Sequence, residues 1–255
     1  MTNNIKLYCA CDLRYKEIAA NWALHLEDKN IHDYEVICTD KDSLEFIKER
    51  GLNAIFYKVS SLDISSRKFS APESGELYNG FKLKILKHLL AQKTSFIFSD
   101  ADAVVLKDPR PCISPYLSNG FFVVSRGLQK GPFYKKFGFA ICSGWMAVGL
   151  GAERGWLLRH INSFLKESGQ PLIGGYKVNC DQEYFNHLFL EQEAEVVKDG
   201  DTATHFSAKF SNIAVMSNAL ISRGRKKDSS LVVHPWSSNT KETITRLKLD
   251  DLWIL

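Results

Sequence analysis

The chain has 255 residues, 45% of them hydrophobic and 24% charged, which suits one sizeable α/β domain and excludes a disordered or fibrous chain. The net charge of +4 favours polyanionic ligands such as diphosphates but is too small to indicate a stable nucleic-acid partner. No apolar run approaches the roughly 20 residues that a membrane-spanning helix needs.

The six cysteines include no Cys-x-x-Cys pair, so a zinc site is not expected. Several of them lie in strand-like apolar runs, where reduced buried thiols are common. The polar N-terminus lacks the apolar core of a signal peptide. These features together predict a cytoplasmic protein.

The first half of the chain alternates strand and helix patterns. In chain order we expect strand Ile5–Ala10, helix Tyr15–Glu27, strand Tyr34–Cys38, helix Ser43–Arg50, strand Ala54–Val59, helix Asn79–Gln92 and strand Ser95–Ser99. The long polar stretch Ser60–Glu76 is expected to be a functional or mobile loop. Alternation of this kind predicts right-handed βαβ units and a mainly parallel central sheet flanked by helices.

The second half is less regular, and the rhythm changes near Pro109. Strands are expected at Gly120–Ser125, Ile141–Val148 and Leu231–Val233, and helices at Glu153–Lys166 and Gln182–Leu190.

The strongest local signal is the run Phe96-Ile-Phe-Ser-Asp100-Ala101-Asp102, in which an apolar strand ends at two carboxylates. Ligands of parallel α/β sheets bind beyond the carboxyl ends of strands, so both carboxylates are placed to converge on one cation. Carboxylate and phosphate oxygens suit Mg²⁺ or Mn²⁺. An Asp-x-Asp pattern also occurs in solvated turns, and the buried strand before it is what favours a metal site.

The chain resembles the GT-A-fold nucleotide-diphospho-sugar transferases, whose hallmark is this DxD motif. Four further segments fit the family in order: Phe81-Lys82-Leu-Lys84, Cys142-Ser-Gly-Trp-Met146, Asp181-Gln182-Glu-Tyr-Phe-Asn186, and Val233-His234-Pro-Trp followed by Lys241. The resemblance extends from Ile5 to Lys241. It implies an α/β fold of the Rossmann-like GT-A type, with a nucleotide-sugar-binding half at 1–108, an acceptor-binding half at 109–241 and a tail at 242–255.

The resemblance also implies residue roles. Asp100, Asp102 and His234 would bind a divalent metal, and imidazole favours Mn²⁺ over Mg²⁺. Asp181 and Gln182 would act on the transferred sugar and the acceptor. The implied donor-binding residues are Ala10, Cys11, Asp12, Lys82, Asp100, Ala101, Asp102, Cys142 and Lys241. The partners implied are a nucleotide-sugar donor, UDP-linked by default, and a glycan or other hydroxyl acceptor.

Each role has a structural alternative. His234 can be a packed histidine at a strand end, and Lys82 can belong to a solvated helix face. Asn179 and Gln182 fit a capping box, which leaves Asp181 free for sugar. The basic run Arg223–Lys227 reads as a solvated loop that could also contact an anionic acceptor. The amphipathic tail Leu247–Leu255 is expected to dock on the domain, with subunit pairing or peripheral membrane contact as alternatives.

Two other functions remain open from the sequence. Asp100-Ala-Asp102-Ala-Val104 also fits the nucleophile motif of haloacid-dehalogenase-like phosphatases, although three strands precede it here. The family usually has asparagine where this chain has Cys142, and a thiol bonds a sugar hydroxyl poorly. A sugar-nucleotide-binding protein without activity is therefore the other alternative.

Overall fold

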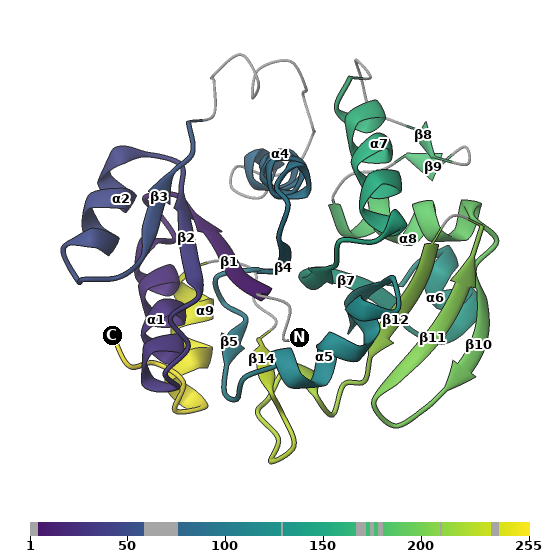
Figure 1. Ribbon diagram of the computed structural model, residues 1–255. Coiled ribbons are helices and arrows are strands. Elements are labelled where there is room, and N and C mark those ends of the chain that lie inside the picture. The colour runs from purple at the N-terminus through teal and green to yellow at the C-terminus, as the bar shows by residue number, and fades with distance from the viewer. Residues whose placement is uncertain are drawn as a thin grey trace.

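A nine-stranded sheet with helices on both faces forms the body of the computed structural model (Figure 1). The structure describes residues 5–58, 76–128, 130–166, 172–173, 176–177, 181–209, 211–235 and 240–255. In chain order the strands of the large sheet are β1 (Ile5–Cys11), β2 (Tyr34–Cys38), β3 (Ala54–Phe56), β4 (Ser95–Ser99), β6 (Phe121–Gly127), β7 (Ala140–Val148), β10 (Glu195–Asp199), β11 (Ala203–Ala208) and β12 (Ser211–Met216).

The other described elements are shorter strands and the helices. A three-stranded sheet contains β5 (Val104–Val105), β13 (Ile221–Arg223) and β14 (Val232–His234), and a two-stranded sheet contains β8 (Leu172–Ile173) and β9 (Tyr176–Lys177). The helices are α1 (Lys16–Asp28), α2 (Lys41–Lys48), α4 (Glu76–Ala91), α5 (Arg110–Ser118), α6 (Pro132–Phe137), α7 (Ala152–Lys166), α8 (Asp181–Glu191) and α9 (Thr240–Leu249).

The α/β class is confirmed, but the large sheet is mixed rather than mainly parallel. Its order is β10-β11-β12-β6-β7-β4-β1-β2-β3, and strands β4, β1, β2 and β3 pair in parallel as expected. Strand β7 pairs antiparallel with both β4 and β6, and β10, β11 and β12 form an antiparallel meander. Antiparallel insertion of β7 brings the second half of the chain against the end of β4.

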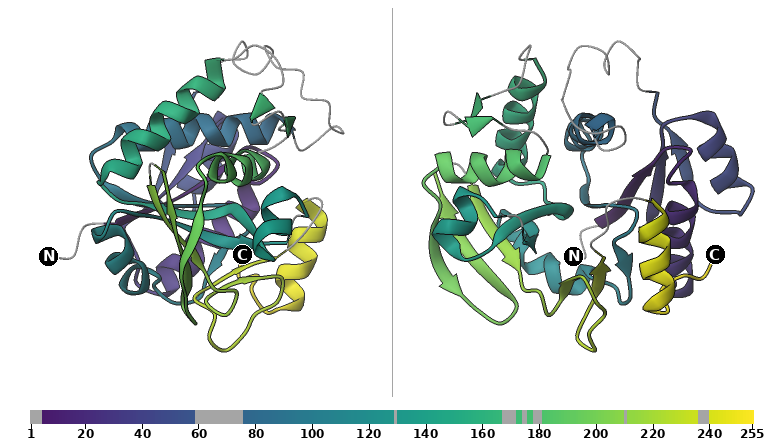
Figure 2. Two further views of the ribbon diagram at one scale, coloured as in Figure 1. Left: turned by 90° about the vertical axis from the view of Figure 1, so that its right-hand side faces the viewer. Right: turned by 180° about the vertical axis from the view of Figure 1, so that it is seen from behind.

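Each face of the sheet has its own apolar core. Successive residues of β4 alternate between them: Ile97 belongs to the core under α1 and α9, whereas Phe96 and Phe98 belong to the core under α4, α7 and α8. Figure 2 shows the helices on the two sides of the sheet. Because β4 is buried on both faces, its three central residues are apolar and its two serines are buried, so the first charged side chain comes only where the strand ends.

The C-terminal tail docks on α1. Leu247 and Leu252 are buried, and the carbonyl of Leu252 accepts a hydrogen bond from the Asn21 amide at 2.9 Å. The amide N–H of Ile254 donates to Asn21 Oδ1 at 2.7 Å. Docking of the tail is therefore confirmed, since both its apolar and its polar groups contact the first helix.

Other sequence expectations have different outcomes. The polar stretch predicted as a loop lies largely outside the described residues, as does Asn179 of the capping box. Helix α6, whose Phe133 is buried, forms where the sequence predicted no helix. Cys9, Cys11, Cys38, Cys112 and Cys142 are free thiols. Among the described residues, no helix is both long and apolar enough to cross a membrane.

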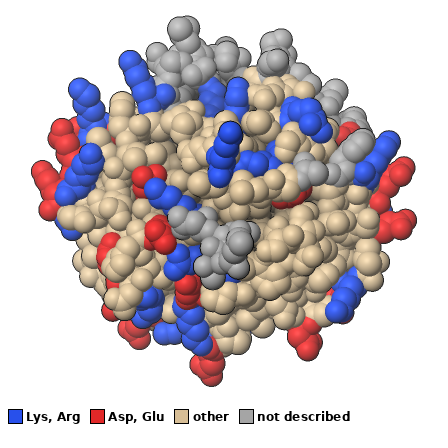
Figure 3. Space-filling model, viewed as in Figure 1, with Lys and Arg blue, Asp and Glu red and all other residues tan. Residues whose placement is uncertain are grey.

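The surface is of mixed charge. On the face seen in Figure 3, Lys and Arg side chains are interspersed with Asp and Glu side chains. The presence of both signs on this face agrees with the small net charge of the chain.

Candidate active site and metal-binding residues

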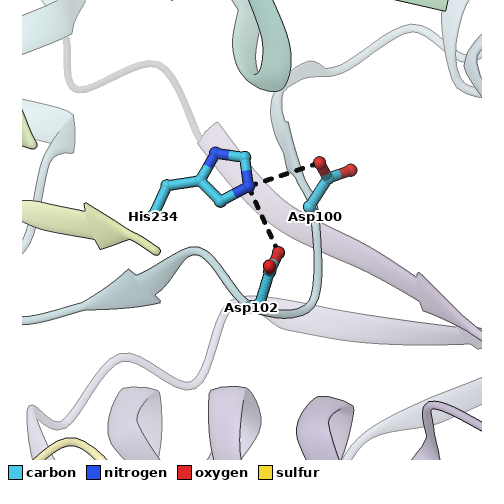
Figure 4. A group of neighbouring side chains, drawn as sticks. All are labelled: Asp100, Asp102 and His234. Carbon is cyan, nitrogen blue, oxygen red and sulfur yellow. Dashed lines mark ion pairs between the residues drawn. The ribbon is translucent and has the colours of Figure 1, made fainter. Parts of the chain in front are cut away.

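Asp100, Asp102 and His234 point toward one another just beyond the end of β4 (Figure 4). One ligand atom from each lies within 4.8 Å of the other two. The imidazole Nε2 is 3.5 Å from Oδ2 of Asp100 and 3.3 Å from Oδ1 of Asp102. The exposed fraction of the side chain is 24% for Asp100 and only 6% for His234, so solvent reaches the cluster mainly at Asp100.

A tight turn after β4 aims both carboxylates at the same place. The amide N–H of Ala103 donates to the carbonyl of Asp100 at 3.0 Å, and that of Val104 donates to the carbonyl of Asp102 at 3.1 Å. Ala101, between the two aspartates, is buried. In an extended strand, residues two positions apart point to the same side but are separated along the strand axis. The turn removes this separation, so the two carboxylates converge.

Strand pairing in the small sheet brings His234 to this turn. Strand β5 follows the turn directly and pairs antiparallel with β14, with Val104 opposite Val233. The next residue of β14 is His234, whose side chain is buried at the level of the carboxylates. The pairing of two residues of β5 with two residues of β14 thus brings together segments that are far apart in the sequence.

Gly144 has no side chain, and this leaves room for the cluster. A Cβ at Gly144 would lie 2.0 Å from Cε1 of His234 and 2.7 Å from Oδ2 of Asp100, which is closer than atoms can approach. The carbonyl of Gly144 also accepts the amide N–H of Asp100 at 2.8 Å. Two carboxylates and an imidazole in a space kept free of a side chain fit a divalent ion such as Mn²⁺ or Mg²⁺.

A register shift in β7 places Gly144 there. Val124 of β6 pairs with Met146 of β7, yet the next residue, Ser125, pairs with Cys142. The intervening residues of β7 bulge out of the ladder, and the Ser125 hydroxyl donates to the carbonyl of Cys142 at 3.3 Å. Bulges commonly re-aim chain segments beside functional sites.

Lys82 is buried, so the alternative of a solvated helix face is wrong. Its Nζ is 2.7 Å from Oδ1 of Asp100 and 3.1 Å from Oδ2 of Asp181, and its side chain is only 5% exposed. Burial acts to lower the pKa of Lys82, but the two carboxylates outweigh it and raise that pKa. The lysine thus joins the turn after β4 to the start of α8.

The start of α8 is fixed to β7 by Asn186. Its Oδ1 accepts the amide N–H of Ile141 at 2.8 Å, and its Nδ2 donates to the carbonyls of Ile141 at 2.9 Å and Gln182 at 2.7 Å. Asp181 is buried at the first position of the helix and Gln182 is half-buried beside it. The Asp-Gln-x-x-x-Asn pattern therefore has a structural reason, because its asparagine positions the two residues at the helix start.

Arg223 enters this site, which the sequence did not predict. Its Nη1 lies 3.0 Å from the Sγ of Cys142 and 2.5 Å from Nδ1 of His234. Burial acts to raise the pKa of the Cys142 thiol, but Arg223 and His234 lower it to about 7. The sequence predicts a solvated loop at residues 223–227, whereas the structure places Arg223 at the end of β13. The short apolar segment before Arg223 is the sequence signal that indicates a strand there.

Histidine and aspartate are electrostatically coupled in the cluster. Burial acts to lower the pKa of His234, but Asp102 raises it to about 9, against the opposing charge of Arg223. Burial acts to raise the pKa of Asp102, but His234 and Arg223 hold it below its ordinary value. His234 and Arg223 thus place positive charge beside the carboxylate of Asp102.

The remaining predicted donor residues belong to β1, to the turn after it and to α9. Ala10 and Cys11 are buried at the end of β1, where Sγ of Cys11 is 3.9 Å from Sγ of Cys38. Oδ1 of Asp12 accepts the amide N–H of Arg14 at 3.0 Å, and Oδ2 of Asp12 pairs with the Arg14 guanidinium at 2.6 Å. Lys241 is exposed in the first turn of α9. Their roles toward a donor stay predictions.

Comparisons with known proteins agree on family and fold. The family model of nucleotide-diphospho-sugar transferases matches residues 29–236. The galactosyltransferase LgtC, solved with donor and acceptor sugar analogs, superimposes with a TM-score of 0.59 at 12% identity, over 97% of this chain and 95% of its own. An active-site LgtC mutant with glutamate in place of glutamine gives 0.57 at 12% identity, over 92% and 88%.

Mouse xyloside xylosyltransferase 1 in its apo form gives a TM-score of 0.57 at 12% identity, over 93% of this chain and 98% of its own. Comparison of the sequence with curated proteins gives no match. The family match favours sugar transfer over the phosphatase alternative. Because the family model covers most of the sequence, the chain belongs to the nucleotide-diphospho-sugar transferase family, and it has the fold of GT-A glycosyltransferases.

Proposed function

We propose that the protein transfers a sugar from a nucleoside diphosphate sugar, UDP-linked by default, to a hydroxyl group of a glycan. The observation that carries the proposal is the convergence of Asp100, Asp102 and His234 beyond β4, with ligand atoms within 4.8 Å of one another. That position, at the carboxyl end of parallel strands, is where α/β sheets bind nucleotides.

Asp100, Asp102 and His234 would hold Mn²⁺, or alternatively Mg²⁺. A divalent ion held there neutralises the charge that builds on a diphosphate as the bond between sugar and diphosphate breaks. The mixed set of two carboxylates and one imidazole supports Mn²⁺ as the first choice. The residues also hold the ion at a fixed place relative to β1, whose end would bind the nucleoside through Ala10, Cys11 and Asp12.

Lys82 and Lys241 supply further positive charge. Lys82 already contacts Asp100 and Asp181, so its ammonium lies between the proposed metal residues and the proposed sugar residues. Lys241 is exposed on α9 and would contact the diphosphate with its ammonium. A lysine acts on phosphate oxygens as a point charge without strict orientation.

Asp181 and Gln182 would bind the transferred sugar at the start of α8. The oxygen of the acceptor hydroxyl forms the new bond to the anomeric carbon of the sugar. The bond from that carbon to the diphosphate breaks, and the proton of the hydroxyl leaves. The Asp181 carboxylate, held by Lys82, suits hydrogen bonds from sugar hydroxyls or acceptance of that proton.

A thermal-shift screen tests the proposal. Purified protein is melted with UDP, GDP or CDP and their sugars, with and without Mn²⁺. We expect one nucleotide to raise the melting midpoint only with Mn²⁺, because a ligand that binds the folded state stabilises it. Asp102→Ala should abolish this shift, whereas Asp201→Ala, which changes an exposed aspartate, should keep it.

Chromatographic detection of released nucleoside diphosphate then measures hydrolysis and transfer. Metal-dependent release, lost in Asp102→Ala, supports the transferase. Tight donor binding without hydrolysis or transfer to a panel of sugars supports the inactive binding protein instead. The absence of any metal-dependent nucleotide shift would reject the proposed donor site.

A further inference from the structure

Arg223 occupies a position that conflicts with a bound ion. The guanidinium Nη1 is 3.1 Å from Nε2 of His234, the same nitrogen that faces Asp100 and Asp102. That nitrogen is the one placed to bind the ion with the two carboxylates. A guanidinium is always charged. A divalent ion on Nε2 would therefore meet a full positive charge at close range, in a largely buried site where water screens little.

The position of Arg223 is built into the fold. It pairs with His234 in the parallel register of β13 and β14, its amide N–H donates to Oδ1 of Asn218 at 2.8 Å, and the amide N–H of Gly224 donates to the carbonyl of His234 at 3.0 Å. The backbone of Arg223 is thus fixed beside the histidine. Its long side chain, half-buried, is the part that can change contacts.

The other contact of the guanidinium is the thiol of Cys142, at 3.0 Å. Sulfur accepts hydrogen bonds weakly. Phosphate oxygens are much better partners for a guanidinium, because its planar fork matches them with two parallel charge-assisted hydrogen bonds. A diphosphate bound beside the metal residues would offer Arg223 a stronger partner than Cys142.

We propose that Arg223 opposes ion binding in the nucleotide-free site and moves its guanidinium to the donor diphosphate when the nucleotide arrives. This inference rests on the proposed function and adds to it a residue and a coupling between the binding of ion and nucleotide. Ion and nucleotide then bind as a pair: the nucleotide removes Arg223 from His234, and the ion attracts the diphosphate. By linkage, each strengthens the binding of the other by the same factor.

Binding of Mn²⁺ measured by electron paramagnetic resonance tests the inference without any activity assay. The free-ion signal is followed during titration of the wild type and of Arg223→Met, with no nucleotide and then with UDP, GDP or CDP. Methionine keeps an apolar stem and removes the charge. Arg225→Met removes the exposed arginine two positions later and is the control for net charge.

We expect Arg223→Met to bind Mn²⁺ without nucleotide about tenfold more tightly than the wild type, and to lose most of the gain that nucleotide gives, in line with ordinary coupling between sites. Arg225→Met should behave as the wild type. Arg223→Lys, a second variant that keeps the charge without the planar fork, should still oppose Mn²⁺ but bind nucleotide less tightly.

The two failures can be told apart. If the wild type binds nucleotide with Mn²⁺ but Mn²⁺ affinity without nucleotide is the same in Arg223→Met, Arg223→Lys and the wild type, the role of Arg223 is refuted and the proposed function stands. If the wild type binds none of the nucleotides with Mn²⁺, the proposed donor site is refuted, and the role of Arg223 falls with it.

Discussion

Lys82 and Asp181 form a buried ion pair, with Nζ 3.1 Å from Oδ2, that links α4 to the first residue of α8. The same ammonium is 2.7 Å from Asp100, so one lysine compensates a carboxylate from each half of the chain. Removing one partner of a buried pair is costly, because the remaining charge loses its compensation while still shielded from water.

Lys82→Met should therefore lower the free energy of unfolding by about 3 kcal/mol, since two carboxylates would remain close together without the ammonium. Urea denaturation of the metal-free protein measures the change. Lys87→Met, on the exposed side of the same helix, should alter stability by no more than about 0.5 kcal/mol. Equal stability of the two variants would show that the ion pair does not contribute to the free energy of unfolding.

Gly144→Ala should disrupt the metal cluster, because the new Cβ would overlap His234 and Asp100. We expect stability to fall by about 1–3 kcal/mol, the usual cost of overpacking, and the Mn²⁺-dependent rise in melting midpoint to vanish. Gly131→Ala is the matched control, since a Cβ there meets open space. A Gly144→Ala protein that binds Mn²⁺ normally would contradict the assigned cluster.

Asn186→Ala should loosen the start of α8, since the amide N–H and carbonyl of Ile141 both lose their side-chain partner. A buried backbone group left unpaired costs about 1–3 kcal/mol, and the sugar-transfer rate should fall because Asp181 and Gln182 are no longer fixed. Thermal denaturation and initial-rate kinetics measure the two effects. Asn119→Ala, whose amide bonds an exposed carbonyl, should change neither.

Mn²⁺ affinity should rise with pH. The pKa of His234 is about 9 in the metal-free protein, raised by Asp102, so below that pH an ion must displace a proton. Apparent affinity should increase about tenfold per pH unit toward pH 9 and then level off. Conversely, the raised pKa stabilises the metal-free fold fully below pH 6.5, a contribution lost as pH rises through 9.

Isothermal titration calorimetry at several pH values measures this dependence. His234→Gln removes the titrating ring and should flatten the slope as well as weaken binding. An affinity that does not change with pH in the wild type would mean that His234 is not a ligand of the ion.

Several of these features can be predicted from the sequence because they depend on local pattern. The apolar run of β4 ends at Asp100 since a strand buried on both faces excludes charge until it leaves the core. The helix–strand alternation of residues 5–99 predicts the parallel strands β1 to β4, because a helix that joins two strands of one sheet makes them parallel. The strand β10 has no such pattern, because all five of its residues are exposed, and α5 contains Pro115, which disguises a helix.

By itself, then, the sequence determines the class of fold and the carboxylates at the end of β4 from local pattern, and the family from the order of short motifs along the chain. Tertiary structure alone decides how the residues of the site contact one another and that Arg223 belongs to it. His234 reaches Asp102 through the pairing of β14 with β5, Lys82 turns inward because Asp100 and Asp181 compensate its charge, and Arg223 approaches the histidine through β13. These contacts join segments that are far apart in the sequence, and no local pattern of residues predicts which distant segments will meet. Only the packing of the sheets and helices establishes them.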